Sequence, residues 1–521
     1  MMLLEAIHMK LYAKERLLIE IEQLQIHKRD RIGLVGKNGN GKTTLLEVLA
    51  GRRTPDLGHV HSFVRRELLP QLKQTDTSKS GGEVTQQYIN QALNSDPDIL
   101  FADEPTTHLD TSHIEWLEKK LSNWQGAFVI VSHDREFLDT VCTTIWEIDE
   151  GQIKEYKGNY SDYVAQKKLK TQQHHLAYEK FQKKKRQLED AISQKTKKAQ
   201  RATKAPKKVS SSEARITGAK PYFAKKQKKL DQTANALKTR VELLEKVEKP
   251  KDVTPIKMTL PNEETFKGRI ILQAKDVKGS AGDRLLWQEA SFHVRGGDKL
   301  AIIGVNGSGK TTLIQKMLNQ AEGFTHFKAM KVGYFSQNLN LLDTEKTIIE
   351  NVSTSTIQDE TFVRTVLARL HFYREDVFKP VSVLSGGERV KVALAKLFVS
   401  DSNTLILDEP TNFLDIEAVT ALEGLLKEYE GTVIFVSHDR RFIRQVATRI
   451  LEIKEKTLVR FDGAYDDYID HKPQEKRNHA EDERLILETK ISEVLSLLSI
   501  EPTDALEQQF QHLLAEKRKL Q

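Results

Sequence analysis

The sequence contains a single cysteine, Cys142, among its 521 residues. One thiol excludes an intrachain disulfide, and it excludes zinc or iron–sulfur sites built from several thiolates. Long apolar runs are also missing: a stretch such as GAFVIVSH is far shorter than the roughly 18 residues that span a bilayer. The amino-terminal MMLLEAIHMK carries Glu5 and too short an apolar run for a signal peptide. These absences predict a cytoplasmic protein without a membrane domain of its own.

The net charge of +7 is unevenly distributed along the chain. Between Tyr163 and Pro250 there are 25 Lys or Arg residues and 8 Asp or Glu residues, a local net charge of +17, which leaves −10 for the rest of the chain. A basic tract flanked by two acidic-leaning regions favours a polyanionic partner that is contacted at one place.

A long internal repeat organises the chain. It pairs GKNGNGKTT with GVNGSGKTT, KSGGE with LSGGE, DILFADEPTTHLD with NTLILDEPTNFLD, and VIVSHDR with IFVSHDR. In both copies the glutamate of DEPT lies 24 positions after the serine of SGGE, and the histidine of SHDR lies 29 positions after that glutamate. A repeat of this length indicates two copies of one domain, which the chain length easily accommodates.

The two copies differ in one interval. Gln71 precedes Ser80 by 9 positions, whereas Gln337 precedes Ser385 by 48. The first copy therefore lacks an insertion that the second one carries. Within each copy, short β-branched runs such as RIGLVG and LAIIG alternate with segments of helical pattern. Such alternation predicts a doubly wound α/β core for each copy.

Each GxxxxGKTT motif follows a predicted strand and opens a predicted helix, which is the context that a phosphate-binding loop requires. Glycines let backbone N–H groups close on phosphate oxygens, the helix amino terminus adds a favourable dipole, and the lysine reaches the β- and γ-phosphates. A glycine turn beside a structural lysine is the plain alternative, and two copies in register disfavour it. The predicted ATP-binding residues of the two loops are Gly36, Asn38, Gly39, Gly41, Lys42, Thr43 and Thr44, and Gly304, Asn306, Gly307, Gly309, Lys310, Thr311 and Thr312.

In each copy an Asp–Glu pair ends a predicted apolar strand, and a histidine ends the next one. The aspartate is placed to face a bound metal ion, and the glutamate to polarise an attacking water. An acid pair there can also be a plain helix cap, and a lone histidine is more often structural, but the shared spacing favours chemistry. The aspartates are Asp103 and Asp408, and the predicted catalytic residues are Glu104, Glu409, His133 and His438.

With these motifs, the chain resembles the ABC ATPase superfamily along both halves. The SGGE stretches match its signature motif and SHDR matches its switch histidine. The resemblance implies that the two domains face each other head to tail, so that Lys42 would share an ATP with Ser385, and Lys310 one with Ser80. The implied signature residues are Ser80, Gly81, Gly82, Glu83, Ser385, Gly386, Gly387 and Glu388.

The resemblance also assigns the remaining ligands. Tyr12 matches the aromatic residue that stacks on adenine. Two departures are Lys79, where the signature usually has Leu, and Ala281, where the second site would have its aromatic residue. The two sites are therefore expected to turn over unequally. The implied ligands are ATP and Mg²⁺, and the implied Mg²⁺-site residues are Thr43, Gln71, Asp103, Thr311, Gln337 and Asp408.

The basic tract predicts two antiparallel helices joined by a loop near residues 203–219. Pro206, the serines at 210–212 and Gly218 break helices between two apolar seams. A helix of about 35 residues in this pair would be on the order of 50 Å long at 1.5 Å per residue. The seams comprise Tyr178, Phe181, Leu188 and Ile192, and Leu230, Ala234, Leu237, Val241 and Leu244.

Cations cluster around this predicted loop. Residues 196–223 hold eight Lys or Arg residues and one acid, Glu213. A solvated linker is the plain alternative, but the charges are nearly all of one sign and the seams would hold the loop on a stiff support. Recognition of RNA by shape and by stacking on splayed bases suits such a tip. The predicted RNA contacts are Lys197, Lys198, Arg201, Lys204, Lys207, Lys208, Arg215 and Lys220.

Tandem ABC domains with a basic helical linker and no membrane segment are similar to the ABC-F family of translation factors. Within it the chain is most similar to the Vga-type antibiotic-resistance proteins, through its linker, its short first interval and the carboxy-terminal LILETKISEVLSLLSIEP. The resemblance implies a ribosome-associated monomer whose own two ATPase domains pair, and whose linker contacts large-subunit rRNA and P-site tRNA near the peptidyl-transferase centre. It implies protection against lincosamide, streptogramin A and pleuromutilin antibiotics.

Three other functions compete with this one. A housekeeping ABC-F factor acting on stalled ribosomes would share every motif. The ATPase subunit of a membrane drug exporter would use the insertion that the first copy lacks, and a DNA-repair ATPase typically carries zinc modules or very long coiled coils. The expected architecture is therefore two tandem ABC-type P-loop ATPase domains, residues 1–160 and 251–472, a two-helix linker at 161–250, and a helical carboxy-terminal extension at 473–521.

Overall fold

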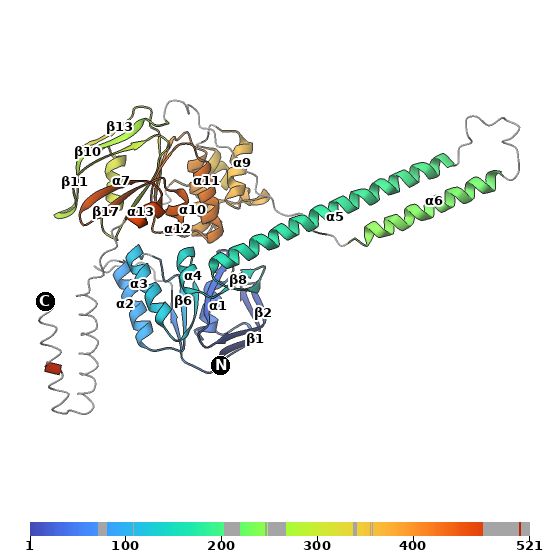
Figure 1. The fold of residues 1–521 in the computed structure, drawn as a ribbon, viewed down its shortest axis with the longest axis horizontal. Helices are drawn as coiled ribbons and strands as arrows, with labels where there is room; N and C mark the ends of the chain where they lie inside the picture. Colours follow the sequence, from blue (N-terminus) through green and yellow to red (C-terminus); the bar gives the residue numbers. More distant parts are fainter. Residues whose placement is uncertain are drawn as a thin grey trace. The chain divides into compact units, whose positions relative to one another are not determined.

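The computed structural model describes residues 1–70, 81–107, 109–202, 219–244, 247, 267–336, 341–354, 356, 358–471 and 510–511 (Figure 1). The chain divides into two compact units, Met1–Lys257 and, apart from Asp415–Glu417, Met258–Gln521. Residues 203–218 of the predicted loop and nearly all of the predicted extension at 473–521 lie outside the described residues. The division into four domains stays a prediction.

The first unit contains two sheets. Three antiparallel strands follow the order β2-β1-β4, and six strands follow the order β5-β6-β7-β3-β8-β9, all parallel except β9. Every residue of β6 and β7 is buried, as expected for parallel strands that are covered on both faces. The strands are β1 (Met2–Ala13), β2 (Arg16–His27), β3 (Arg31–Gly36), β4 (Leu57–Ser62), β5 (Arg66–Leu69), β6 (Ile99–Asp103), β7 (Ala127–Val131), β8 (Thr144–Asp149) and β9 (Gln152–Lys157).

The second unit repeats both sheets, with the orders β11-β10-β13 and β14-β15-β16-β12-β17-β18. These orders correspond strand by strand to those of the first unit, so the predicted duplication of a doubly wound α/β domain is confirmed. The strands are β10 (Ile270–Ala281), β11 (Arg284–Arg295), β12 (Lys299–Gly304), β13 (Phe324–His326), β14 (Val332–Phe335), β15 (Thr404–Asp408), β16 (Thr432–Val436), β17 (Arg449–Lys454) and β18 (Thr457–Asp462).

The helices show the difference between the copies. In the second unit the interval between β14 and α10 contains α8, α9 and two 3₁₀ helices, whereas in the first unit only residues 70–80 separate β5 from α2. The helices of the first unit are α1 (Lys42–Leu49), α2 (Gly81–Asn94), α3 (Thr111–Asn123), α4 (Arg135–Val141), α5 (Tyr160–Ala202) and α6 (Ala219–Glu242). Those of the second are α7 (Lys310–Leu318), α8 (Ile348–Ser353), α9 (Glu360–Arg369), η3 (Arg374–Phe378), η4 (Val381–Val383), α10 (Gly386–Phe398), α11 (Ile416–Glu428), α12 (Arg440–Val446) and α13 (Tyr465–His471).

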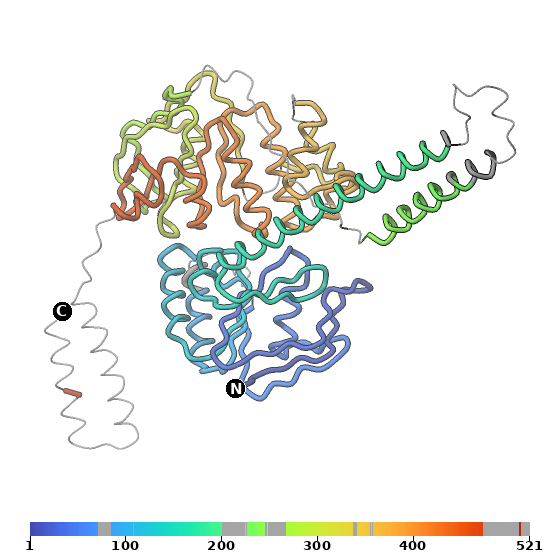
Figure 2. The backbone as a smooth tube through the Cα atoms, turned by 45° about the vertical axis from the view of Figure 1, so that its right-hand side comes forward, coloured from blue at the N-terminus to red at the C-terminus, as the bar shows by residue number. Residues whose placement is uncertain are grey.

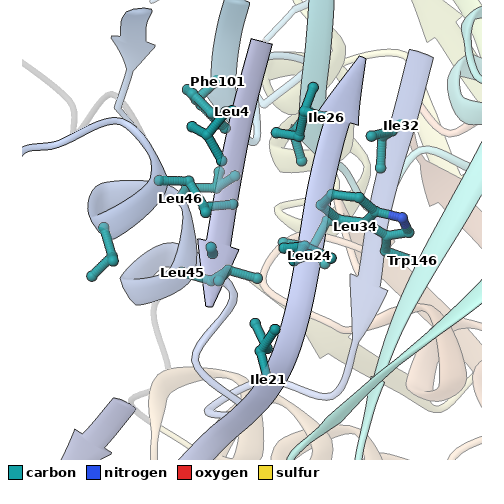
Figure 3. Packing of buried hydrophobic residues seen from close by; sticks show 14 of the residues in the cluster. Leu4, Ile21, Leu24, Ile26, Ile32, Leu34, Leu45, Leu46, Phe101 and Trp146 are labelled. Atoms are coloured by element: carbon teal, nitrogen blue, oxygen red, sulfur yellow. The ribbon is translucent and has the colours of Figure 1, made fainter. Parts of the chain in front are cut away.

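A buried apolar cluster holds the first phosphate-binding loop in place. Leu45 and Leu46 of α1 pack with Leu4 of β1, Phe101 of β6 and Trp146 of β8 (Figure 3). Because α1 begins directly after the loop, the packing of its first turn fixes where the loop's backbone amides point.

The linker helices α5 and α6 pack against each other, and both views show them side by side (Figures 1 and 2). Both predicted seams are confirmed: their side chains are buried or half-buried, while most neighbouring positions are exposed. With 43 residues, α5 is longer than the predicted helix of about 35 residues and spans about 65 Å at 1.5 Å per residue. Among the helices that the structure describes, none is both long and apolar enough to cross a membrane.

Candidate nucleotide-binding sites

The first phosphate-binding loop joins β3 to α1. Gly41 caps α1 in the left-handed conformation, with φ 87°, and provides no side-chain acceptor for the amides of the first turn. The buried Lys42 donates from Nζ to the carbonyl oxygens of Gly36 at 2.7 Å and Lys37 at 3.2 Å. Burial lowers the pKa of Lys42, and the nearby Glu104 carboxylate opposes that shift. The loop thus places the start of a helix and a lysine where an anionic ligand can bind, and its residues fit a triphosphate.

The second loop repeats this geometry between β12 and α7. Gly309 caps α7 at φ 102°, and Lys310 donates from Nζ to the carbonyl oxygens of Gly304 at 2.9 Å and Val305 at 3.2 Å. A Cβ added to Gly309 would lie 2.6 Å from the Trp287 ring, so only glycine fits here without rearrangement. The sequence-predicted loop residues therefore come together in both copies.

Each loop lies beside an acid at the end of a parallel strand. Thr43 donates from Oγ1 to Oδ2 of Asp103 at 2.7 Å. Burial raises the pKa of Asp103 and of Asp408, while hydrogen bonds from Thr43 and Thr311, respectively, oppose the shift. A hydroxyl beside a carboxylate is a donor set that Mg²⁺ accepts, so these residues fit the metal. Gln71 and Gln337 lie outside the described residues, and their metal role stays a prediction.

The two glutamates occupy strained and matching positions. Glu104 and Glu409 have φ of 52° and 50°, a left-handed conformation that costs a non-glycine residue about 1–3 kcal/mol. In both, the side-chain Oε1 is buried and, within the described part of the chain, lacks a hydrogen-bond partner. Nε2 of His133 and Nε2 of His438 each lie 3.3 Å from Oε1 of the glutamate in the same copy. A buried carboxylate oxygen that accepts no hydrogen bond from the protein can accept one from the water molecule that attacks the phosphate.

We propose Glu409 as the general base of the second site, and its burial makes the proposal testable by pH. Desolvation raises the pKa of Glu409 to about 7, although Lys310 opposes the shift. A carboxyl group accepts a proton only when ionised, so its activity is expected to rise as pH increases through about 7.

Phosphate release by the Glu104→Gln variant, in which the second site carries the turnover, should therefore climb with a midpoint near pH 7. The Glu104→Gln, Glu409→Gln double variant supplies the background rate. A flat profile between about pH 5.5 and 8.5 would contradict the assignment.

The signature serine is described in the second copy. Ser385 is the N-cap of α10, and its Oγ donates to Oε2 of Glu388 at 2.7 Å while the Glu388 amide donates back. Gly386 has open space where a side chain would stand, so nothing in the described structure covers this side of the turn. Lys79, Ser80 and the side chains of residues 81–83 lie outside the described residues, so the pairing of loops with signatures stays a prediction.

The register of the amino-terminal hairpins corrects one assignment. Tyr12 pairs with Leu17, and in the second copy Ser280 pairs with Leu285. The residue equivalent to Tyr12 is therefore Ser280, and not Ala281 as expected from the sequence. The conclusion that the second site has no aromatic residue at this position is unchanged.

The predicted RNA-contact residues are only partly described. Lys197 and Lys198 are exposed on α5. Arg201 and Lys220 belong to α5 and α6, but their side chains lie outside the description. Lys204, Lys207, Lys208 and Arg215 fall in the undescribed loop, and their role stays a prediction.

Sequence reasoning missed the anchor of the linker on the first sheet. The buried carboxylate of Glu147 in β8 accepts hydrogen bonds from Tyr163 at 2.8 Å and Tyr156 at 3.2 Å, and Lys167 of α5 pairs with it at 2.6 Å. The next residue along β8 accepts a hydrogen bond from Asn40 of the phosphate-binding loop. One strand thus connects the loop to the base of α5. The recurrence of GNYSDY as GAYDDY was the available signal.

Comparisons with known proteins agree with this geometry. Residues 20–75 and 287–412 match a family model described as ABC transporter, and residues 146–260, which include α5 and α6, match a second model of the same description. The chain is 32% identical to "Ribosome protection protein VmlR" of Bacillus subtilis, over 93% of this chain and 91% of that protein. It is 31% identical to "Erythromycin resistance ATP-binding protein MsrA" of Staphylococcus epidermidis, over 84% and 95% of the two chains.

The chain belongs to the ABC-F family of ATPases. The solved structure of an "RNase-L Inhibitor" aligns with a TM-score of 0.55 at 20% identity, covering 84% of this chain and 87% of that one, which supports the fold alone. As an ABC-F protein the chain is an ATPase whose two ABC domains bind ATP, in agreement with the paired loops and acids described above.

Proposed function

We propose that this ABC-F ATPase is a ribosome protection factor. In this proposal it binds the ribosome in its ATP form and directs the α5–α6 linker toward the peptidyl-transferase region of the large subunit. The observation that carries it is the linker itself: a long, stiffly paired helical hairpin with net charge +17 over residues 163–250, anchored on the sheet that carries a phosphate-binding loop. The likeness to a ribosome protection protein over nearly the whole chain supports the same function.

The chemistry of the cycle follows from the sites. The phosphate-binding loops hold ATP through their amides and Lys42 or Lys310, and the strand-end aspartates with Thr43 and Thr311 would hold Mg²⁺, which neutralises charge on the transferred phosphate. Glu104 and Glu409 accept a proton from the attacking water, while His133 and His438 lie beside them. In the proposed cycle, ATP draws the two ATPase domains together and sets the linker for ribosome binding, and hydrolysis releases the protein.

We further propose that the antibiotics countered are lincosamides, streptogramin A compounds and pleuromutilins. The support is the similarity of the linker and the short first interval to Vga-type proteins. A basic loop that contacts folded RNA would clear the drug site in one of two ways. It would displace the drug directly, or it would reshape the surrounding rRNA. The proposed partners are large-subunit rRNA and P-site tRNA, and the protein would work as a monomer in the cytoplasm.

A reconstituted translation reaction tests the function. With a lincosamide at a concentration that halves reporter synthesis, the purified protein and ATP are expected to restore most of the synthesis. The Lys42→Ala, Lys310→Ala variant is the control, because it lacks the lysines that hold the phosphates. Rescue of peptide synthesis on stalled ribosomes without drug, with no effect on inhibited ones, would instead establish a housekeeping factor.

A further inference from the structure

Arg284 lies against the second phosphate-binding loop. A Cβ placed on Gly307 would stand 3.9 Å from Nη1 and 4.0 Å from Nη2 of this residue, so its guanidinium group lies near the loop at this glycine. The side chain is exposed, and no hydrogen bond or ion pair to another residue is found for it within the described part of the chain. A free cation beside a backbone that cradles phosphates is placed for an anionic ligand.

The first copy lacks this arrangement. Arg16 is equivalent to Arg284 in the hairpin register, since it pairs with Ala13 as Arg284 pairs with Ala281. A Cβ placed on Gly39, which is equivalent to Gly307, would meet no atom within 4 Å, so Arg16 does not reach this part of its loop. The first copy has Tyr12 at the hairpin position where the second copy has Ser280.

We propose that Arg284 is a nucleotide-binding residue of the second site and that it binds the triphosphate in compensation for the missing aromatic residue. Guanidinium groups bind phosphate oxygens through charge-assisted hydrogen bonds, which are stronger than neutral ones and indifferent to the base. Aromatic stacking, by contrast, acts on the base itself. In this proposal the first site binds ATP through both the base and the phosphates, whereas the second site binds it chiefly through the phosphates.

This difference has a consequence for specificity. A site that relies on phosphate contacts gains little affinity from the base. The second site should thus bind inorganic tripolyphosphate nearly as tightly as ATP, while the first site, where Tyr12 adds stacking on the base, should bind ATP more tightly than tripolyphosphate. Arg284 and Ser280 together make the two sites of one chain unequal in the share of their affinity that depends on the base.

Calorimetric titration of the full-length protein tests the inference. The second site is isolated in a Lys42→Ala, Glu409→Gln background, and the probes are ATP, GTP and inorganic tripolyphosphate. Arg284→Ala is expected to weaken all three by about tenfold, or 1.4 kcal/mol, and Arg284→Lys by less. The matched control is Arg16→Ala in the Lys310→Ala, Glu104→Gln background, which should change ATP affinity at the first site less than about twofold.

Two results would overturn the proposal. One is an unchanged affinity of the Arg284→Ala variant for ATP, with a melting temperature equal to that of the parent, which would make Arg284 a plain surface residue. The other is a weaker affinity for ATP with an unchanged affinity for tripolyphosphate, because the side chain would then act on the base. A second site that prefers ATP over tripolyphosphate as strongly as the first site does would contradict the inferred difference between the two sites.

Discussion

Replacing both Glu104 and Glu409 by glutamine is expected to lower ATP turnover by about 10²–10³-fold and to leave the protein bound to ribosomes as long as ATP is present. Each glutamate carries a buried oxygen without a hydrogen-bond partner in the described structure, beside a histidine and at the end of a strand that borders a phosphate-binding loop. Glutamine keeps the shape and the hydrogen bond from the histidine amide, but it cannot take a proton from water.

The trapped state follows from the proposed cycle, in which ATP favours ribosome binding and hydrolysis ends it. Sedimentation of ribosomes through a sucrose cushion, with the variant and either ATP or ADP, measures the retained fraction. The matched control is Glu115→Gln with Glu345→Gln, which removes two exposed carboxylates of similar charge and should leave turnover and sedimentation unchanged. Failure of the Glu104→Gln, Glu409→Gln protein to sediment with ribosomes in ATP would contradict the cycle.

Replacing Lys204, Lys207 and Lys208 by alanine is expected to reduce antibiotic protection by at least about tenfold while sparing the ATPase activity measured without ribosomes. Each lysine that neutralises a phosphate of single-stranded RNA contributes a salt slope of about −0.7, so loss of three contacts weakens binding and flattens its salt dependence. The three lysines follow Ala202, the last residue of α5, in the sequence and belong to none of the phosphate-binding or strand-end motifs, so basal hydrolysis has no reason to change.

A second triple variant tests whether the position of the lysines, and not only their total charge, determines protection. Lys180, Lys183 and Lys184 are exposed on the shaft of α5, and their replacement by alanine changes the net charge by the same amount. This variant should retain protection in the translation assay. Equal losses in the two triple variants would show that total charge, and not the tip, governs the effect, and unchanged protection in both would favour a solvated linker.

The sequence predicted those features that short, local patterns specify. Lys42 and Lys310 follow glycines at fixed spacing and start a helix, and both occupy matching loops. The strand order of the second sheet repeats that of the first because the apolar runs recur in the same succession. The seams of α5 and α6 could be predicted because apolar residues recur in the sequence every three or four positions, which matches the helical period of 3.6 residues.

Features that depend on which residues meet in space were not predictable in this way. The equivalence of Tyr12 with Ser280 depends on hairpin register, which a one-residue difference in alignment obscures. Glu147 meets Tyr163 and Lys167 only because β8 and the base of α5 are adjacent in space. Arg284 belongs to no sequence motif, and only the fold places its guanidinium group near Gly307.

An electron cryo-microscopy map of the Glu104→Gln, Glu409→Gln protein trapped on ribosomes with ATP tests the central claim most directly. The account predicts that residues 203–219 lie against large-subunit rRNA beside the peptidyl-transferase centre, with Lys204, Lys207 or Lys208 on phosphates. A map in which the protein is bound elsewhere, or in which this loop meets only solvent, would contradict it.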